Sequence, residues 1–142
     1  MELSIDTTLQ IRFSDTDAMG VVWHGNYLRF FEDGREAFGE KYGLEYLDVY
    51  NAGYFTPIVK TDINYKNSIY YGDKVKMITR YVNTRSAKIV FEYELINIDS
   101  GLIIAKGSTT QVFLSVKERE LRLDNPDFYM KWKQGLFNAG RL

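Results

Sequence analysis

Two carboxylates and the only histidine of the chain lie within ten residues of one another. They belong to the run from Asp15 to Tyr27, DTDAMGVVWHGNY, which precedes a segment with helical spacing. The first backbone N–H groups of a helix have no partner within it and lie at the positive end of its dipole. Such groups stabilise an oxygen atom that gains negative charge during a reaction, and a nearby carboxylate can supply the attacking chemistry. The run therefore predicts a reactive site at a helix start.

Each of these side chains also has a structural interpretation. Aspartate is common in turns and before helices, so either Asp15 or Asp17 can serve only to order the loop. His24 can shuttle a proton, support a neighbouring group, or be a polar residue satisfied at the helix start. The spacing of these three residues matches no familiar metal site, so we expect no metal ion and no other cofactor.

The composition is that of one ordered domain, residues 1–142. Hydrophobic residues make up 45% of the chain and aromatic residues 15%, which favours a sheet-rich globule. The net charge is −1 with scattered basic residues, so nucleic acid is not an expected partner. The absence of cysteine excludes a thiol nucleophile. No run of residues is long and apolar enough for a signal peptide or a membrane helix, so we expect a cytoplasmic protein without a membrane partner.

The reactive run lies between an expected strand and an expected long helix. Alternating apolar residues predict a strand over Thr7–Phe13. From Tyr27 the apolar spacing becomes helical, with Asn26 as the N-cap and Gly43 after the C-terminus. Gly34 and Gly39 lie inside this helix and cost about 1 kcal/mol each relative to alanine, which close packing should offset.

A meander of strands is expected after a short helical or irregular connection over 44–53. Alternating segments predict strands over Thr56–Tyr65, Val75–Tyr81, Ile89–Leu95 and Leu102–Val116. The intervening polar turns, 71–73, 85–87 and 99–101, predict that consecutive strands are antiparallel neighbours. Asn125 and Pro126 fit the N-cap and first position of a short C-terminal helix. The fold class is therefore α+β, with an antiparallel sheet packed around one long helix.

The run from Arg12 to Arg35, RFSDTDAMGVVWHGNYLRFFEDGR, resembles the signature of the hotdog-fold acyl-CoA thioesterases of the 4-hydroxybenzoyl-CoA thioesterase family, and most of all its YbgC-like branch. The resemblance extends to about Leu123. It implies a five- to six-stranded antiparallel sheet wrapped around one long helix. It also implies a homodimer with its active sites at the subunit interface, and commonly a homotetramer.

The resemblance also assigns roles to particular residues. In the family the second aspartate of the motif, here Asp17, acts on the thioester carbonyl as nucleophile or as general base. The backbone N–H groups of His24 and Gly25 would polarise the carbonyl oxygen, and the His24 side chain would assist. Other hotdog branches place the catalytic acid on the helix, which makes Glu32 the reserve candidate.

The remaining expectations concern the ligand and the rival functions. Arg85 and Lys88 fall where the family binds the phosphates of coenzyme A. Two other functions stay open: a hotdog dehydratase or hydratase acting on acyl thioesters, and a non-catalytic acyl-CoA-binding protein. The chain has no Gly-x-Ser-x-Gly nucleophile turn and no glycine-rich nucleotide-binding loop, which argues against serine hydrolases and nucleotide-dependent enzymes.

Overall fold

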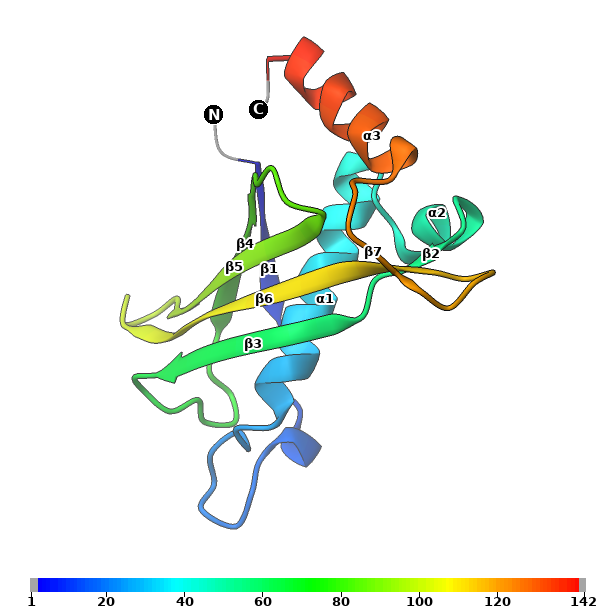
Figure 1. The fold of residues 1–142 in the computed structure, drawn as a ribbon. Coiled ribbons are helices and arrows are strands. Elements are labelled where there is room, and N and C mark those ends of the chain that lie inside the picture. Colours follow the sequence, from blue (N-terminus) through cyan, green and yellow to red (C-terminus); the bar gives the residue numbers. More distant parts are fainter. Residues whose placement is uncertain (1–2, 141–142) are drawn as a thin grey trace.

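The computed structural model describes residues 3–140, with Phe137 described for its backbone only. One long helix, α1, crosses a strongly curved antiparallel sheet, and a C-terminal helix, α3, packs at one end of the molecule (Figure 1). In chain order the elements are β1 (Ser4–Leu9), a 3₁₀ turn (Phe13–Asp15), α1 (Asn26–Tyr42), α2 (Tyr46–Asn51), β2 (Tyr54–Phe55), β3 (Ile58–Tyr65), β4 (Val75–Val82), β5 (Lys88–Asn97), β6 (Ile103–Ser115), β7 (Leu121–Arg122) and α3 (Asp127–Asn138).

The sheet has five long strands in the order β1-β4-β5-β6-β3, and the two-residue strands β2 and β7 also pair with β6. The described residues thus form seven strands, against the five or six expected. The antiparallel pairings of β4 with β5 and of β5 with β6 confirm the prediction from their short turns. The prediction that β3 and β4 are neighbours is wrong, because β3 pairs with β6 and β4 pairs with β1.

Three phenylalanines of α1 form the centre of the core. Phe30, Phe31 and Phe38 are at most 1% exposed, and the Phe31 ring stacks on Tyr93 of β5 with 4.0 Å between centroids. The helix lies close to the sheet where Gly34 faces β4. A Cβ atom at Gly34 would overlap the Thr79 hydroxyl. The expected close packing at this glycine is confirmed, because any side chain would push α1 away from β4.

The ends of the elements differ from the sequence expectations in three places. The first strand covers Ser4–Leu9 rather than Thr7–Phe13, because the chain turns at Phe13–Asp15. The long helix begins at Asn26, so Gly25 is its N-cap; the Asn26 side chain donates to a backbone carbonyl in the preceding loop instead. It ends as expected at Gly43, which adopts the left-handed conformation (φ 76°). Helix α3 begins at Asp127, and Asn125 does not cap it.

Strand β3 is an edge strand. Among residues 3–140, β6 is its only partner, and seven of its eight residues are exposed. The exposed residues include Ile58, Val59 and Tyr65, which are 42–61% exposed. Lys60, Thr61, Asp62 and Asn64 are exposed on the same strand, so its side chains are mixed in polarity. Its free row of backbone groups is a template for pairing with another strand. Within the described chain, none of the helices is both long enough and apolar enough to cross a bilayer.

Candidate functional site

Asp15 holds the loop before α1 in place. It is 5% exposed, and its carboxylate accepts hydrogen bonds from the Arg12 N–H (2.8 Å) and the Arg29 guanidinium (2.6 Å). Its backbone carbonyl accepts the Trp23 N–H (2.9 Å) and the Asn26 side-chain amide (2.8 Å). One residue thus joins both ends of the loop to the first turn of α1. Asp15 is therefore committed to structure, as one of its two interpretations expected.

Asp17 lies in the same loop but is only half-buried. Its Oδ1 accepts the Met19 N–H at 2.8 Å, and a turn closes between the Gly20 N–H and the Asp17 carbonyl (3.0 Å). Gly20 adopts a positive φ of 78°, a conformation that favours glycine. In the part of the chain that the structure describes, no donor contacts Oδ2 of Asp17. The loop therefore fixes the direction of this side chain and leaves one carboxylate oxygen available.

The backbone N–H groups of His24 and Gly25 precede α1, and neither has a hydrogen-bond partner among the described residues. The turn that presents them is held from both sides. The Asn26 N–H donates to the Trp23 carbonyl, and the Tyr65 hydroxyl of β3 donates to the His24 carbonyl (each 3.0 Å). Two available donors at the positive end of a 17-residue helix form a site that suits a developing negative charge.

The aromatic side chains beside this turn change its local environment. The His24 ring lies 5.2 Å from the Trp23 ring and 6.2 Å from the Tyr65 ring. Loss of hydration on burial, and to a smaller extent the neighbouring Tyr65, raise the pKa of Tyr27 to about 12. Both phenols therefore stay neutral at physiological pH. Neither carries a negative charge that would offset the positive end of the α1 dipole.

Glu32 does not lie with Asp17. It lines a separate cleft of about 370 Å³ farther along α1, between that helix, α2 and the sheet. Arg35 and Glu36 line the same cleft, whose floor includes the buried Ile89 and Phe91. The cleft has the size and the mixture of apolar and polar walls of a small-molecule site, although Asp17 does not line it.

Arg85 and Lys88 lie at the opposite end of α1 from Asp17. Both are exposed at the turn between β4 and β5, which packs beside α3, whereas the loop that carries Asp17 lies at the other end of the helix (Figure 1). Seventeen helical residues span about 25 Å. Within one chain, Asp17, His24 and Gly25 thus belong to the loop at one end of α1, and the two basic residues lie at its other end.

Two residues that position the loop were not predicted from the sequence. Arg29 pairs with Asp15 across fourteen residues, and Tyr65 reaches the His24 carbonyl from a strand forty-one residues away. Arg29 follows Asn26 by three residues, and this helical spacing puts it on the loop side of α1. Nothing in the sequence indicates the contact of Tyr65. Within residues 3–140, no three His, Asp or Glu side chains are arranged to hold a metal ion.

Comparison with known proteins gives consistent results across nearly the whole chain. Residues 11–132 match the family model described as the thioesterase-like superfamily. The chain is 29% identical over 129 residues to the Bacillus subtilis (strain 168) protein named "Putative acyl-CoA thioesterase YneP", covering 89% of this chain and 93% of that protein.

Solved structures show the same fold. A DHNA-CoA thioesterase from Staphylococcus aureus superposes with a TM-score of 0.81 at 30% identity, covering 98% of this chain and 96% of that one. The 4-hydroxybenzoyl-CoA thioesterase from Pseudomonas sp. strain CBS-3 superposes with a TM-score of 0.77 over 91% of this chain and 98% of that one. At 24% identity this second likeness shows the fold alone, which is the expected hotdog arrangement of a sheet around a central helix.

Proposed function

This chain belongs to the thioesterase-like superfamily, and on that premise we propose that it hydrolyses an acyl-CoA thioester to a carboxylic acid and coenzyme A. The observation that carries the proposal is that the two aspartates of the loop before α1 have different environments. Asp15 holds the loop, whereas Asp17 keeps one carboxylate oxygen without a donor in the same loop as two N–H groups that have no partner among the described residues. A thioester carbonyl is already reactive, so a directed carboxylate and an oxyanion site suffice.

The reaction then has two routes with the same products. In one, an Asp17 oxygen bonds to the carbonyl carbon, the C–S bond breaks, and water hydrolyses the resulting mixed anhydride. In the other, Asp17 takes a proton from water as the water oxygen bonds to the carbonyl carbon, and the C–S bond then breaks. In both routes the His24 and Gly25 N–H groups hold the oxyanion, and the departing thiolate takes up a proton, with His24 as its donor.

The test compares Asp17→Asn with Glu32→Gln, the rival carboxylate in the cleft. Thiol release from a panel of acyl-CoA substrates is followed with a thiol reagent, and circular dichroism checks folding. We expect Asp17→Asn to lower kcat by about 10² or more, and Glu32→Gln to leave it within about threefold. Full activity of Asp17→Asn would overturn the proposal. Loss of water without thiol release would indicate a hydratase or dehydratase, and binding without turnover would indicate an acyl-CoA-binding protein.

We propose further that the active unit is a homodimer joined at β3. The exposed edge of β3 supports such pairing, because antiparallel addition of a second β3 would continue the sheet. A two-fold axis reverses the direction of α1, so the partner's turn between β4 and β5 would lie at the end of α1 that carries Asp17. Arg85 and Lys88 would then bind the phosphates of a coenzyme A whose thioester lies at the other subunit's Asp17.

Mixing two impaired variants tests this arrangement, at an acyl-CoA concentration low enough for Arg85→Ala to show little activity. A hybrid dimer of Asp17→Asn and Arg85→Ala chains contains one site with both defects and one site with neither, if the two residues come from different chains. We therefore expect the mixture to recover activity after subunit exchange, with a dimer or tetramer in sedimentation. A mixture that stays at the summed activity of the separate variants, or a monomer, would contradict the shared site.

A further inference from the structure

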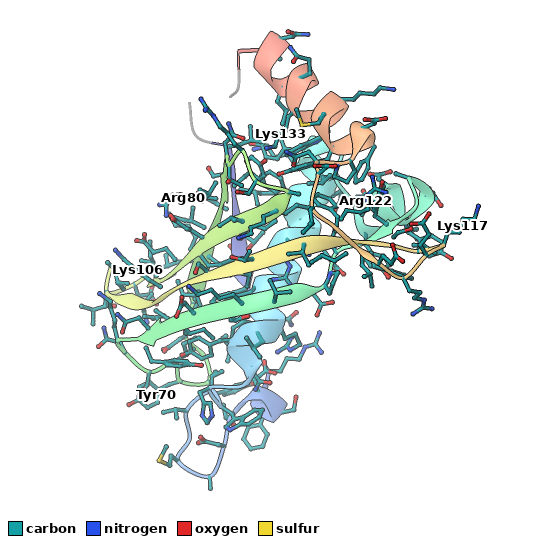
Figure 2. The ribbon with its side chains drawn as sticks, in the orientation of Figure 1. Tyr70, Arg80, Lys106, Lys117, Arg122 and Lys133 are labelled. Atoms are coloured by element: carbon teal, nitrogen blue, oxygen red, sulfur yellow. The ribbon has the colours of Figure 1, made fainter. Side chains whose placement is uncertain are left out.

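The turn between β4 and β5 is held by side chains from the C-terminal segment. The Asn125 amide donates to the Arg85 carbonyl (3.0 Å), the Tyr129 hydroxyl donates to the Lys88 carbonyl (3.1 Å), and the Lys133 ammonium donates to the Thr84 carbonyl (2.6 Å). Figure 2 places Lys133 between α3 and this turn. Three donors from a segment at least forty residues away therefore hold carbonyls of one exposed turn.

These donors are themselves rigidly placed. Tyr129 is fully buried, and its ring lies nearly parallel to that of Trp132 at 5.8 Å. The Trp132 indole N–H donates to the Tyr42 carbonyl at the end of α1 (2.8 Å), and the Lys133 ammonium lies 4.6 Å from the centre of the Tyr129 ring. Helix α3 is thus anchored in the core and at the end of α1. An anchored helix restricts the backbone of the turn that it contacts.

The side chains that the turn presents are cationic and uncompensated. Arg85 and Lys88 are exposed, and neither forms an ion pair with a carboxylate among residues 3–140. A guanidinium and an ammonium whose backbones are fixed lose less conformational entropy when they bind a polyanion. Without the three donors, the backbone of the turn before β5 would be held only by the pairing of Lys88 with Val112 and by bonds within the turn, and Arg85 would have more orientations.

We propose that Asn125, Tyr129 and Lys133 are positioning residues that hold Arg85 and Lys88 in the orientation that binds the phosphate groups of coenzyme A. The inference rests on the proposed function, because it takes the phosphate-binding role of this turn from it. Helix α3 then contributes to substrate affinity without contacting the thioester. Its effect is confined to substrates that carry the phosphorylated nucleotide.

The experiment measures kcat and KM on an acyl-CoA and on the pantetheine thioester of the same acyl group, which lacks the nucleotide. Tyr129→Phe and Asn125→Ala each remove one donor to the turn without changing charge. Because Tyr129→Phe also removes the partner of the buried Tyr81 hydroxyl, thermal melting checks that each variant is folded at the assay temperature. We expect each to raise KM for the acyl-CoA about threefold to tenfold, the range for one neutral hydrogen bond, with kcat within about twofold. The KM for the pantetheine thioester stays unchanged. Lys133→Met should act in the same direction, and the exposed Lys131→Met on the same helix is its matched control.

Arg85→Ala separates the two levels of the inference. If Arg85→Ala raises KM for the acyl-CoA only, while Tyr129→Phe and Asn125→Ala leave it unchanged, the positioning role is refuted and the phosphate role stands. If Arg85→Ala changes KM for both substrates equally or for neither, the phosphate role itself is refuted.

The Lys133→Met variant tests whether the lysine acts by its charge. If Lys133→Met raises KM and Tyr129→Phe does not, the lysine acts by charge, which also refutes positioning. If neither thioester is hydrolysed, the dissociation constant of coenzyme A replaces KM, and the same comparisons decide.

Discussion

We predict that Asp15→Asn lowers the stability of the protein, whereas Asp17→Asn lowers its activity. The Asp15 carboxylate is buried and accepts two hydrogen bonds, from the Arg12 N–H and from the Arg29 guanidinium. Bonds to a charged group contribute about 1.5–3 kcal/mol each, against about 0.5–1.5 kcal/mol for neutral bonds. Asparagine retains one acceptor oxygen, and the Arg29 side chain is 40% exposed, which reduces its share. Asp15→Asn should therefore lower the free energy of unfolding by about 2–3 kcal/mol.

Asp17→Asn should leave the fold nearly unchanged. Among residues 3–140, the one hydrogen bond of its side chain is the short-range bond from the Met19 N–H to Oδ1, and the amide oxygen of asparagine accepts the same bond. The free energy of unfolding should change by less than about 0.5 kcal/mol, as for most surface substitutions. The loss of kcat described above then reflects the missing charge and not a disordered loop.

Urea denaturation and thermal melting of the two variants and the parent measure this difference. For a chain of this size, 2–3 kcal/mol corresponds to a fall in Tm of about 5–10 °C for Asp15→Asn. Asp15→Asn should retain more activity than Asp17→Asn at a temperature where both variants are folded. Equal destabilisation by the two substitutions, or a stable Asp15→Asn variant, would refute the assignment of Asp15 to structure and Asp17 to chemistry.

Three further perturbations test the packing and the electrostatics. Gly34→Ala should lower the free energy of unfolding by about 1–2 kcal/mol, because the clash with Thr79 outweighs the better helix propensity of alanine. Urea denaturation measures this change, and a stabilised variant would show that α1 is not in close contact with β4. Burial raises the pKa of Tyr27 and Tyr81 to about 12, so above pH 10 the unfolded chain binds fewer protons than the folded one and stability falls as pH rises. Denaturation at pH 8 to 12 should show a loss of about 2 kcal/mol per tyrosine by pH 12, and a flat profile would contradict the burial. Tyr65→Phe removes the bond to the turn before α1 and should lower kcat about threefold to tenfold with little change in KM, whereas an unchanged kcat would show that the turn needs no support from β3.

The sequence alone determined the features that depend on local spacing. The helical period after Tyr27 and the glycine at 43 defined α1, and the alternation of apolar residues located β4, β5 and β6. The reactive run from Asp15 to Tyr27 was recognisable because a loop before a helix start needs only neighbouring residues to form its turn. The antiparallel pairing of β4, β5 and β6 also followed, since short turns leave the chain no alternative.

The tertiary structure decided everything that depends on residues far apart in the sequence. Strand β3 pairs with β6, because the chain leaves the edge of the sheet before β4 and returns beside β1. The three donors to the turn between β4 and β5 come from a segment whose sequence carries no sign of that turn, and the Asp15 contact with Arg29 is indicated only by the helical spacing of Arg29 from Asn26. Periodicity reports which face of an element is buried, but the partner that covers this face is selected by packing of the whole chain. The distance between Asp17 and Arg85 could therefore be learned only from the folded molecule.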